Sequence, residues 1–139
     1  MPKAMTMISA AIPATLQPMI EGSPIDSMEV AKAIVGEDLH IDPNVLAHLA
    51  KEKTFSTSAR VAAVYALGYV AETEEQAAVL RDILADQTDD LTVREHAAEA
   101  LGNLGDKGSL TLLQNVLAIE TSEPLRASCR YAIEELNEL

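Results

Sequence analysis

Apolar residues recur along most of this chain with the period of an amphipathic α-helix, not with the alternation of a β-strand. The pattern is clearest in three segments: ARVAAVYALGYV (59–70), VREHAAEALGNL (93–104) and LRASCRYAIEEL (125–136). In each segment, apolar residues stand at positions i, i+4, i+8 and i+11, which places them on one face of a helix. We therefore predict three helices over these ranges.

The three segments are also copies of one another. Arg94 follows Arg60 by 34 residues, and Arg126 follows Arg94 by 32. The other aligned positions hold small or aliphatic residues, namely Ala63, Ala97 and Cys129, then Leu67, Leu101 and Ile133, then Val70, Leu104 and Leu136. A residue that recurs once per unit usually serves the interface between units. We predict that the three arginines form a structural ladder bonded to neighbouring turns, with Asp86, Asp89 and Asp90 as candidate acceptors.

Second helical patterns lie between these segments, over residues 74–86 and 107–120. An earlier copy of the second pattern covers residues 42–53, and a leading helix over 26–36 precedes it. The pattern is a helix–turn–helix unit repeated about every 33 residues, and such a unit can bury its apolar face only against its neighbours. The sequence predicts an all-α fold, an α-solenoid of HEAT-like helical hairpins forming a fragment of a right-handed superhelix. We expect an N-terminal extension or cap over 1–24, repeats over about 25–56, 57–91 and 92–124, and a terminal helix over 125–139.

Two glycines occupy one repeat position inside the predicted helices. Gly68 and Gly102 each cost about 1 kcal/mol relative to alanine at such a place. A close helix crossing would offset this cost, and we predict that the second helix of the same unit crosses there. The matching residue of the last copy is Glu134, after which no second helix is predicted, and its acidic surroundings are expected to keep the end of the stack soluble.

The segment VREHAAEALGNLGD (93–106) and the segment 59–70 resemble the short HEAT-like repeats of the phycobilisome lyase type, whose consensus is close to VRxxAAxALGxLGD. The resemblance covers roughly residues 25–139 and is strongest at 93–106. It implies a HEAT-like solenoid. Because those proteins handle chromophores on acceptor proteins, it also implies an accessory role in a bilin lyase complex as one alternative.

The same run resembles deoxyhypusine hydroxylase, a HEAT-like enzyme with a di-iron centre, whose ligands come from His-Glu pairs in RHEAAEALG-like segments. Here the order is reversed, Glu95 then His96, which rotates each ligand by ~100° about the helix axis. The aligned residues of the preceding copy are Val61 and Ala62. A di-iron site needs several converging His and carboxylate ligands. We therefore predict no metal site, and a metal-dependent hydroxylase-like enzyme remains the second alternative.

Composition narrows the classes of function. The chain has 22 acidic and 10 basic residues, a net charge of −12 and no Lys/Arg cluster, which argues against a nucleic-acid partner. No apolar run approaches the ~20 residues that span a bilayer, so we expect no membrane partner and a cytoplasmic location.

Cys129, the only cysteine, stands on the apolar stripe and is interpreted as a buried hydrophobe. Neither a GxSxG elbow nor a glycine-rich phosphate loop is present. We predict no catalytic or cofactor-binding residue, no cofactor and no enzymatic activity.

The remaining candidate is a surface. Solenoids offer extended curved faces for binding, and we predict a non-catalytic protein-interaction or scaffold module that binds a protein or peptide on the face of its second helices. The outward positions there are Asn44, His48, Lys51, Arg81, Asp82, Thr111, Gln114 and Asn115. Their mixed polarity suits a peptide or a helix of another protein, and a solvated face is the alternative. The oligomeric state is left open.

Overall fold

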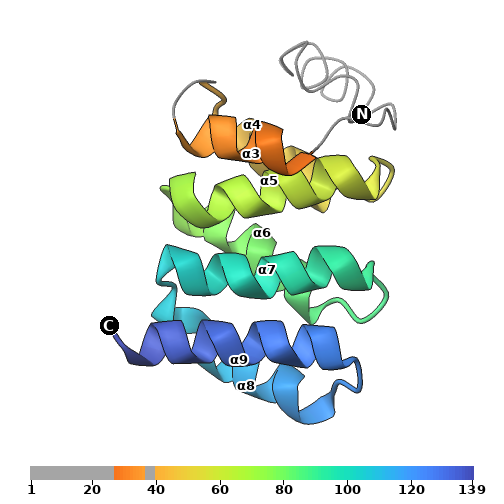
Figure 1. Cartoon of the computed structure of the whole chain (residues 1–139), viewed down its shortest axis with the longest axis vertical. Helices are drawn as coiled ribbons and strands as arrows, with labels where there is room; N and C mark the ends of the chain where they lie inside the picture. The colour runs from red at the N-terminus through yellow and green to blue at the C-terminus, as the bar shows by residue number, and fades with distance from the viewer. Residues whose placement is uncertain (1–26, 37–39) are drawn as a thin grey trace.

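A computed structural model of the chain describes residues 27–36 and 40–139 (Figure 1). Within these ranges the regular structure is entirely helical: α3 (Ser27–Val35), α4 (Pro43–Lys51), α5 (Thr57–Val70), α6 (Glu74–Ala85), α7 (Leu91–Leu104), the short 3-10 helix η2 (Lys107–Ser109), α8 (Leu110–Ile119) and α9 (Glu123–Asn137). The all-α prediction is confirmed. The cap expected over residues 1–24 lies outside the described residues. No helix in the described ranges has both the length and the apolar character to cross a membrane.

The helices form two stacked rows. The first-helix row consists of α3, α5, α7 and α9, which lie side by side, and the second-helix row consists of α4, α6 and α8 behind them (Figure 1). The core lies between the rows and includes the fully buried side chains of Leu46, Leu67, Leu80, Leu101 and Leu113. Each helical pair shelters its apolar face against the next pair. The prediction of an α-solenoid of helical hairpins is therefore confirmed.

Short polar side chains cap the N-termini of several of these helices. Asp42 accepts a hydrogen bond from the backbone N–H of Asn44 in α4 at 2.9 Å. Ser56 accepts one from the first turn of α5, and Asp90 does the same for α7. In α6, Thr73 and Gln76 bond to each other's backbone N–H groups in a capping box. These caps satisfy donors that the first turn of a helix leaves without a partner.

Two glycines set the spacing within the first-helix row. A Cβ atom added to Gly68 would lie 2.9 Å from the Cα atom of Ala100 in α7, and one added to Gly102 would lie 2.7 Å from the Cα atom of Ala132 in α9. The prediction that the second helix of the same unit crosses at these glycines is therefore wrong. The close neighbour is the first helix of the next unit. Glu134, at the equivalent position of α9, is exposed.

Arg60 joins three parts of the stack. Its Nε atom donates to the carbonyl oxygen of Ala50 at the end of α4, at 2.9 Å. Its two terminal nitrogens donate to the carboxylate of Asp89, in the turn after α6, at 2.7 and 2.8 Å. Both side chains are buried. Of the other candidate acceptors, Asp86 pairs with Lys53 and Asp90 caps α7.

The two later arginines repeat part of this arrangement. Arg94 donates to the carbonyl oxygen of Leu84 in α6 from two nitrogens, at 3.1 and 2.9 Å, and to the carboxylate of Glu120 after α8 at 2.8 Å. Arg126 donates to the carbonyl oxygens of Leu117 and Glu120. Each aligned arginine thus bonds to the carboxyl end of the preceding second helix, where carbonyl groups lack intrahelical partners.

Candidate functional site

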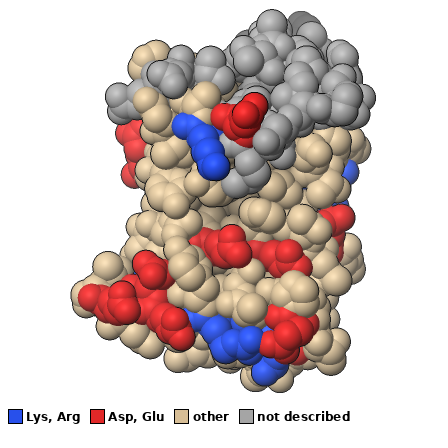
Figure 2. All heavy atoms as spheres, in the orientation of Figure 1, with Lys and Arg blue, Asp and Glu red and all other residues tan. Residues whose placement is uncertain are grey.

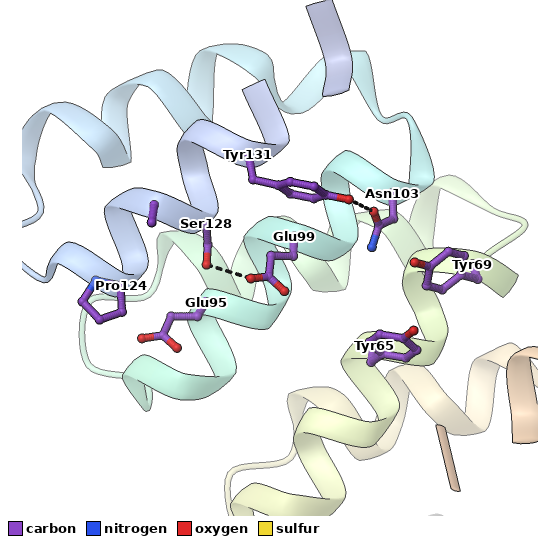
Figure 3. A pocket seen from close by; sticks show the side chains of 9 residues that line it. Tyr65, Tyr69, Glu95, Glu99, Asn103, Pro124, Ser128 and Tyr131 are labelled. Carbon is purple, nitrogen blue, oxygen red and sulfur yellow. Dashed lines mark hydrogen bonds between the residues drawn. The ribbon is translucent and has the colours of Figure 1, made fainter. Parts of the chain in front are cut away.

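A groove of about 540 Å³ crosses the first-helix row at α5, α7 and α9 (Figure 3). It is lined by three tyrosines, two glutamates and several smaller residues: Tyr65, Tyr69, Glu95, Glu99, Asn103, Pro124, Ala127, Ser128 and Tyr131. Figure 2 shows this face of the molecule, with acidic side chains lying in a row across its middle, over α7. The groove therefore combines negative charge with aromatic surface.

The lining residues occupy equivalent positions in successive repeats. Tyr65, Glu99 and Tyr131 share one repeat position, and Tyr69 and Asn103 share another, four residues further along their helices. Residues four apart lie on the same face of a helix. The repeat itself therefore brings these side chains to one surface.

Two side-chain hydrogen bonds connect α9 to α7 inside the groove (Figure 3). The hydroxyl group of Ser128 donates to the carboxylate of Glu99 at 3.1 Å. The hydroxyl group of Tyr131 donates to the side-chain oxygen of Asn103 at 2.6 Å. Glu95 differs from these residues, because its half-buried carboxylate makes no hydrogen bond or ion pair within the described residues. One negative charge of the groove is thus available to a ligand.

Tyr69 and Tyr131 have raised pKa values and stay neutral in this environment. Burial, followed by the negative charges of Glu135 and Glu99, raises the pKa of Tyr131. Burial also raises the pKa of Tyr69, and the neighbouring Tyr65 adds to the shift. The rings of Tyr65 and Tyr69 lie tilted against each other, with their centroids 5.4 Å apart. Tyr69 and Tyr131 therefore offer aromatic faces and hydroxyl groups, not additional negative charge.

Metal ligands do not converge in the described part of the chain. No group of three or more His, Cys, Asp or Glu side chains in residues 27–36 and 40–139 could hold a metal ion. The Nδ1 atom of His96 lies 2.8 Å from the carbonyl oxygen of Thr92 in its own helix, and His96 does not line the groove that Glu95 lines. These residues do not fit a ligand set drawn from several His-Glu pairs.

The predicted binding residues of the second-helix row fall into two groups. Asn44, His48 and Lys51 line a smaller hollow of about 280 Å³ between α4 and α6. Arg81 lies outside it and pairs with Asp106 at 2.6 Å. The remaining residues, Asp82, Thr111, Gln114 and Asn115, are exposed and do not line this hollow. The structure therefore brings three of the eight predicted residues together.

Sequence reasoning missed the groove of the first-helix row. The signal was present, because large aromatic or polar residues stand at the same two outward repeat positions in α5, α7 and α9. The apolar positions recur from repeat to repeat, whereas these outward positions vary in residue type. An alignment of the positions that vary, such as Tyr65 against Glu99 and Tyr131, would have indicated the groove.

A family profile described as HEAT repeats matches residues 43–134, which is well over half of the chain. The chain therefore belongs to the HEAT-repeat family. The phycobilisome lyase form of the resemblance stays a prediction. No solved structure matches the chain significantly.

Several curated relatives are deoxyhypusine hydroxylases. The enzyme of Debaryomyces hansenii is 42% identical over 57 residues, which cover 41% of this chain and 18% of the enzyme. The enzyme of Saccharomyces cerevisiae is 40% identical over 63 residues, covering 45% of this chain and 19% of the enzyme. Deoxyhypusine hydroxylase-B of Oryza sativa subsp. japonica is 36% identical over 76 residues, which cover 55% of this chain and 25% of the enzyme. The matched regions thus span about a fifth to a quarter of these relatives.

These relatives correct two predictions. The prediction of a non-catalytic interaction or scaffold module is wrong, and so is the prediction that the chain is not an enzyme, because the curated relatives are enzymes and point to a hydroxylase-like function. The reversed pair Glu95 and His96, and the absence of known catalytic motifs, are therefore not sufficient grounds for excluding an enzyme. A fold does not determine a function, so the ligand types in a few helical repeats do not exclude a class of activity.

Proposed function

We propose that this chain has a hydroxylase-like function, the hydroxylation of deoxyhypusine or a related group on a protein partner. The observation that carries the proposal is the identity of 36–42% to deoxyhypusine hydroxylases. We propose further that the groove across α5, α7 and α9 is the surface that receives the substrate. Its place in the fold supports this, because Glu95 stands in the segment that resembles the ligand-bearing segments of the hydroxylase.

In this proposal the described residues hold the substrate and do not form a metal centre. The sequence has three histidines, His40, His48 and His96, and the described residues gather no ligand set around them. A metal centre built from several His-Glu pairs needs more histidines than the groove contains. The metal ligands of the reaction would therefore come from residues outside the groove.

The charge of the chain supports a positively charged substrate. The net charge is −12, and no Lys or Arg lines the groove. A cleft lined by one sign of charge concentrates ligands of the opposite sign and accelerates their association. The same charge disfavours nucleic acid as a partner. We propose the cytoplasm as the location, which the single, buried Cys129 supports because a reduced thiol suits that compartment.

The test is a hydroxylation assay with two preparations of the protein. In one, the purified chain is supplied with Fe²⁺, dioxygen and a deoxyhypusine-bearing protein; in the other, the chain is isolated with its bound partners from its native cells. Mass spectrometry then measures the addition of one oxygen atom to the substrate. We expect product in the second preparation and a lower rate with Glu95→Gln, while Glu29→Gln, the same change of charge at an exposed position of α3 outside the groove, leaves the rate unchanged. Absence of product in both preparations would contradict the proposal.

A further inference from the structure

We propose that the hollow between α4 and α6 binds a small organic carboxylate through Asn44, His48 and Lys51. This hollow belongs to the second-helix row and shares no lining residue with the groove across α5, α7 and α9. The proposal uses none of the residues that the hydroxylase-like function uses. Either proposal can therefore fail without the other.

A buried histidine in this hollow has a ring nitrogen without a hydrogen-bond partner. His48 lines the hollow and is only 9% exposed, and its ring packs edge-on against Phe55 with the ring centroids 5.9 Å apart. Its Nε2 atom is buried and makes no hydrogen bond within the described residues. Buried polar atoms in native proteins nearly always have a partner, so this nitrogen indicates a group that the described residues do not supply. The hollow that His48 lines is the place from which such a group can reach the ring.

The polar residues of α4 stand on one face of the helix. Asn44, His48 and Lys51 are four and three residues apart, a spacing that places side chains on the same side of a helix. The Oδ1 atom of Asn44 accepts a hydrogen bond from Gln76 at 3.0 Å, which leaves the amide NH₂ group as a donor. Lys51 is exposed and makes no ion pair or hydrogen bond within the described residues. This face of α4 therefore offers donors and one positive charge to a ligand.

These donors match a carboxylate on a short apolar body. A carboxylate accepts hydrogen bonds only, and its bonds from a charged group such as the ammonium of Lys51 are stronger than bonds between neutral groups. Ala47 and Val79 add apolar surface to the hollow, which a bare inorganic anion would leave unused. The volume of about 280 Å³ lies just below the range of pockets that hold drug-sized ligands, so the ligand is small.

One residue of the hollow opposes an anion and so provides a test of the sign of the ligand's charge. Glu75, on the α6 side, is exposed and makes no hydrogen bond or ion pair within the described residues. Its negative charge repels a carboxylate and attracts a cation. Removal of this charge should therefore strengthen binding of an anion and weaken binding of a cation.

The test measures binding of propionate to the full chain by ¹H–¹⁵N chemical shifts of the backbone and of the histidine rings. Propionamide, n-propylammonium and inorganic phosphate are the comparison probes. We expect propionate to shift the backbone resonances of α4 and α6 and the ring nitrogen resonances of His48. Each comparison probe should bind about tenfold more weakly or less, because it lacks either the carboxylate or the apolar body.

Two charge variants locate the binding site. We expect Lys51→Gln to weaken propionate binding roughly tenfold, as for the loss of one hydrogen bond to a charged group. Glu75→Gln should strengthen propionate binding severalfold, because the repulsion is removed. Lys107→Gln removes the same charge as Lys51→Gln from an exposed residue outside the hollow, so it is the control and should bind like the parent.

His48→Phe separates ligand binding from packing. This variant keeps an aromatic ring beside Phe55 and removes the nitrogen that lacks a partner, so its thermal unfolding temperature should equal or exceed that of the parent. Propionate binding should fall about tenfold, and the ring resonances that propionate shifts should be absent. Propionate binding equal to that of the parent would show that His48 does not contact the ligand. If the variant does not fold, Lys51→Gln and Glu75→Gln still decide the proposal.

Several other results would overturn the proposal. These are the absence of propionate-induced shifts in α4 and α6, equal binding of propionamide, and weaker binding of propionate to Glu75→Gln. Tighter binding of n-propylammonium would identify a cation site, and tighter binding of phosphate a site for inorganic anions. Propionate binding by a protein that hydroxylates nothing would support this proposal and contradict the proposed function alone.

Discussion

The guanidinium group of Arg60 and the carboxylate of Asp89 form a two-point ion pair, with N–O distances of 2.7 and 2.8 Å and side chains that are only 4% and 3% exposed. The same carboxylate accepts a hydrogen bond from the backbone N–H of Asp90 at 2.7 Å. Because Arg60 also bonds to Ala50, one side chain ties α4 and α5 to the turn that follows α6. The pair is therefore a link between successive repeats.

Removing the charge of Asp89 is expected to destabilise the whole stack. Asp89→Asn leaves the buried Arg60 without a negative partner, and breaking a buried pair in this way typically costs 3–5 kcal/mol. We expect urea denaturation to show a loss of about 3 kcal/mol in the free energy of unfolding. Asp82→Asn, at an exposed position, should stay within about 0.5 kcal/mol of the parent. Equal stability of the two variants would show that the pair contributes nothing.

The same pair makes stability depend on acid pH. Burial alone would raise the pKa of Asp89, but the hydrogen bonds from Arg60 and Asp90 and the charge of Arg60 outweigh burial and lower it. The unfolded chain then binds more protons than the native chain below an unfolded pKa of about 3.9, so stability falls as the pH falls through this range. We expect the free energy of unfolding, measured by urea titration at a series of pH values, to drop less steeply below pH ~4 in Asp89→Asn than in the parent.

Gly102 is expected to resist replacement by alanine. Alanine favours a helix over glycine by about 1 kcal/mol. Its Cβ atom would lie 2.7 Å from the Cα atom of Ala132, however, and a backbone atom cannot give way as a flexible side chain can. We expect Gly102→Ala to lower the free energy of unfolding by about 1–3 kcal/mol, the usual cost of overpacking.

Gly108→Ala is the matched control for this prediction. The nearest atom to its added Cβ is a side-chain oxygen of Asp106 at 3.6 Å, which is an ordinary contact. This variant should be close to the parent in thermal and urea unfolding. A Gly102→Ala variant as stable as Gly108→Ala would show that α7 and α9 can separate without cost.

The glycines also show where inference from the sequence ends. Apolar residues such as Leu67 and Leu101 recur at the same place in each helical repeat. This pattern predicts helices and their stacking, because every repeat must bury its apolar face against its neighbours. The position of Gly68 indicates a close approach but not the identity of the approaching helix. That identity depends on the packing geometry of the two rows, which places Ala100 against Gly68.

The groove illustrates the same limit for function. Its outward residues, such as Tyr65, Glu99 and Tyr131, share a repeat position but differ in type from one repeat to the next, so a search for recurring residue types does not find them. They line one groove only because α5, α7 and α9 lie side by side (Figure 1). The arginines differ, because one residue type recurs and each copy bonds to a similar helix end.

Cys129 provides a probe of how the core opens. Its side chain is fully buried in α9, and burial raises the pKa of its thiol to about 11. The thiolate is the reactive form, so both the low thiolate fraction and the lack of access slow its modification in the native protein. We expect labelling by a disulfide reagent at pH 8 to be slow in the parent and to accelerate in Asp89→Asn in proportion to the larger unfolded fraction. Rapid labelling of the parent at the rate of an exposed thiol would mean that α9 detaches from α7 without unfolding of the remaining stack, in contradiction to the close packing of Gly102 on Ala132.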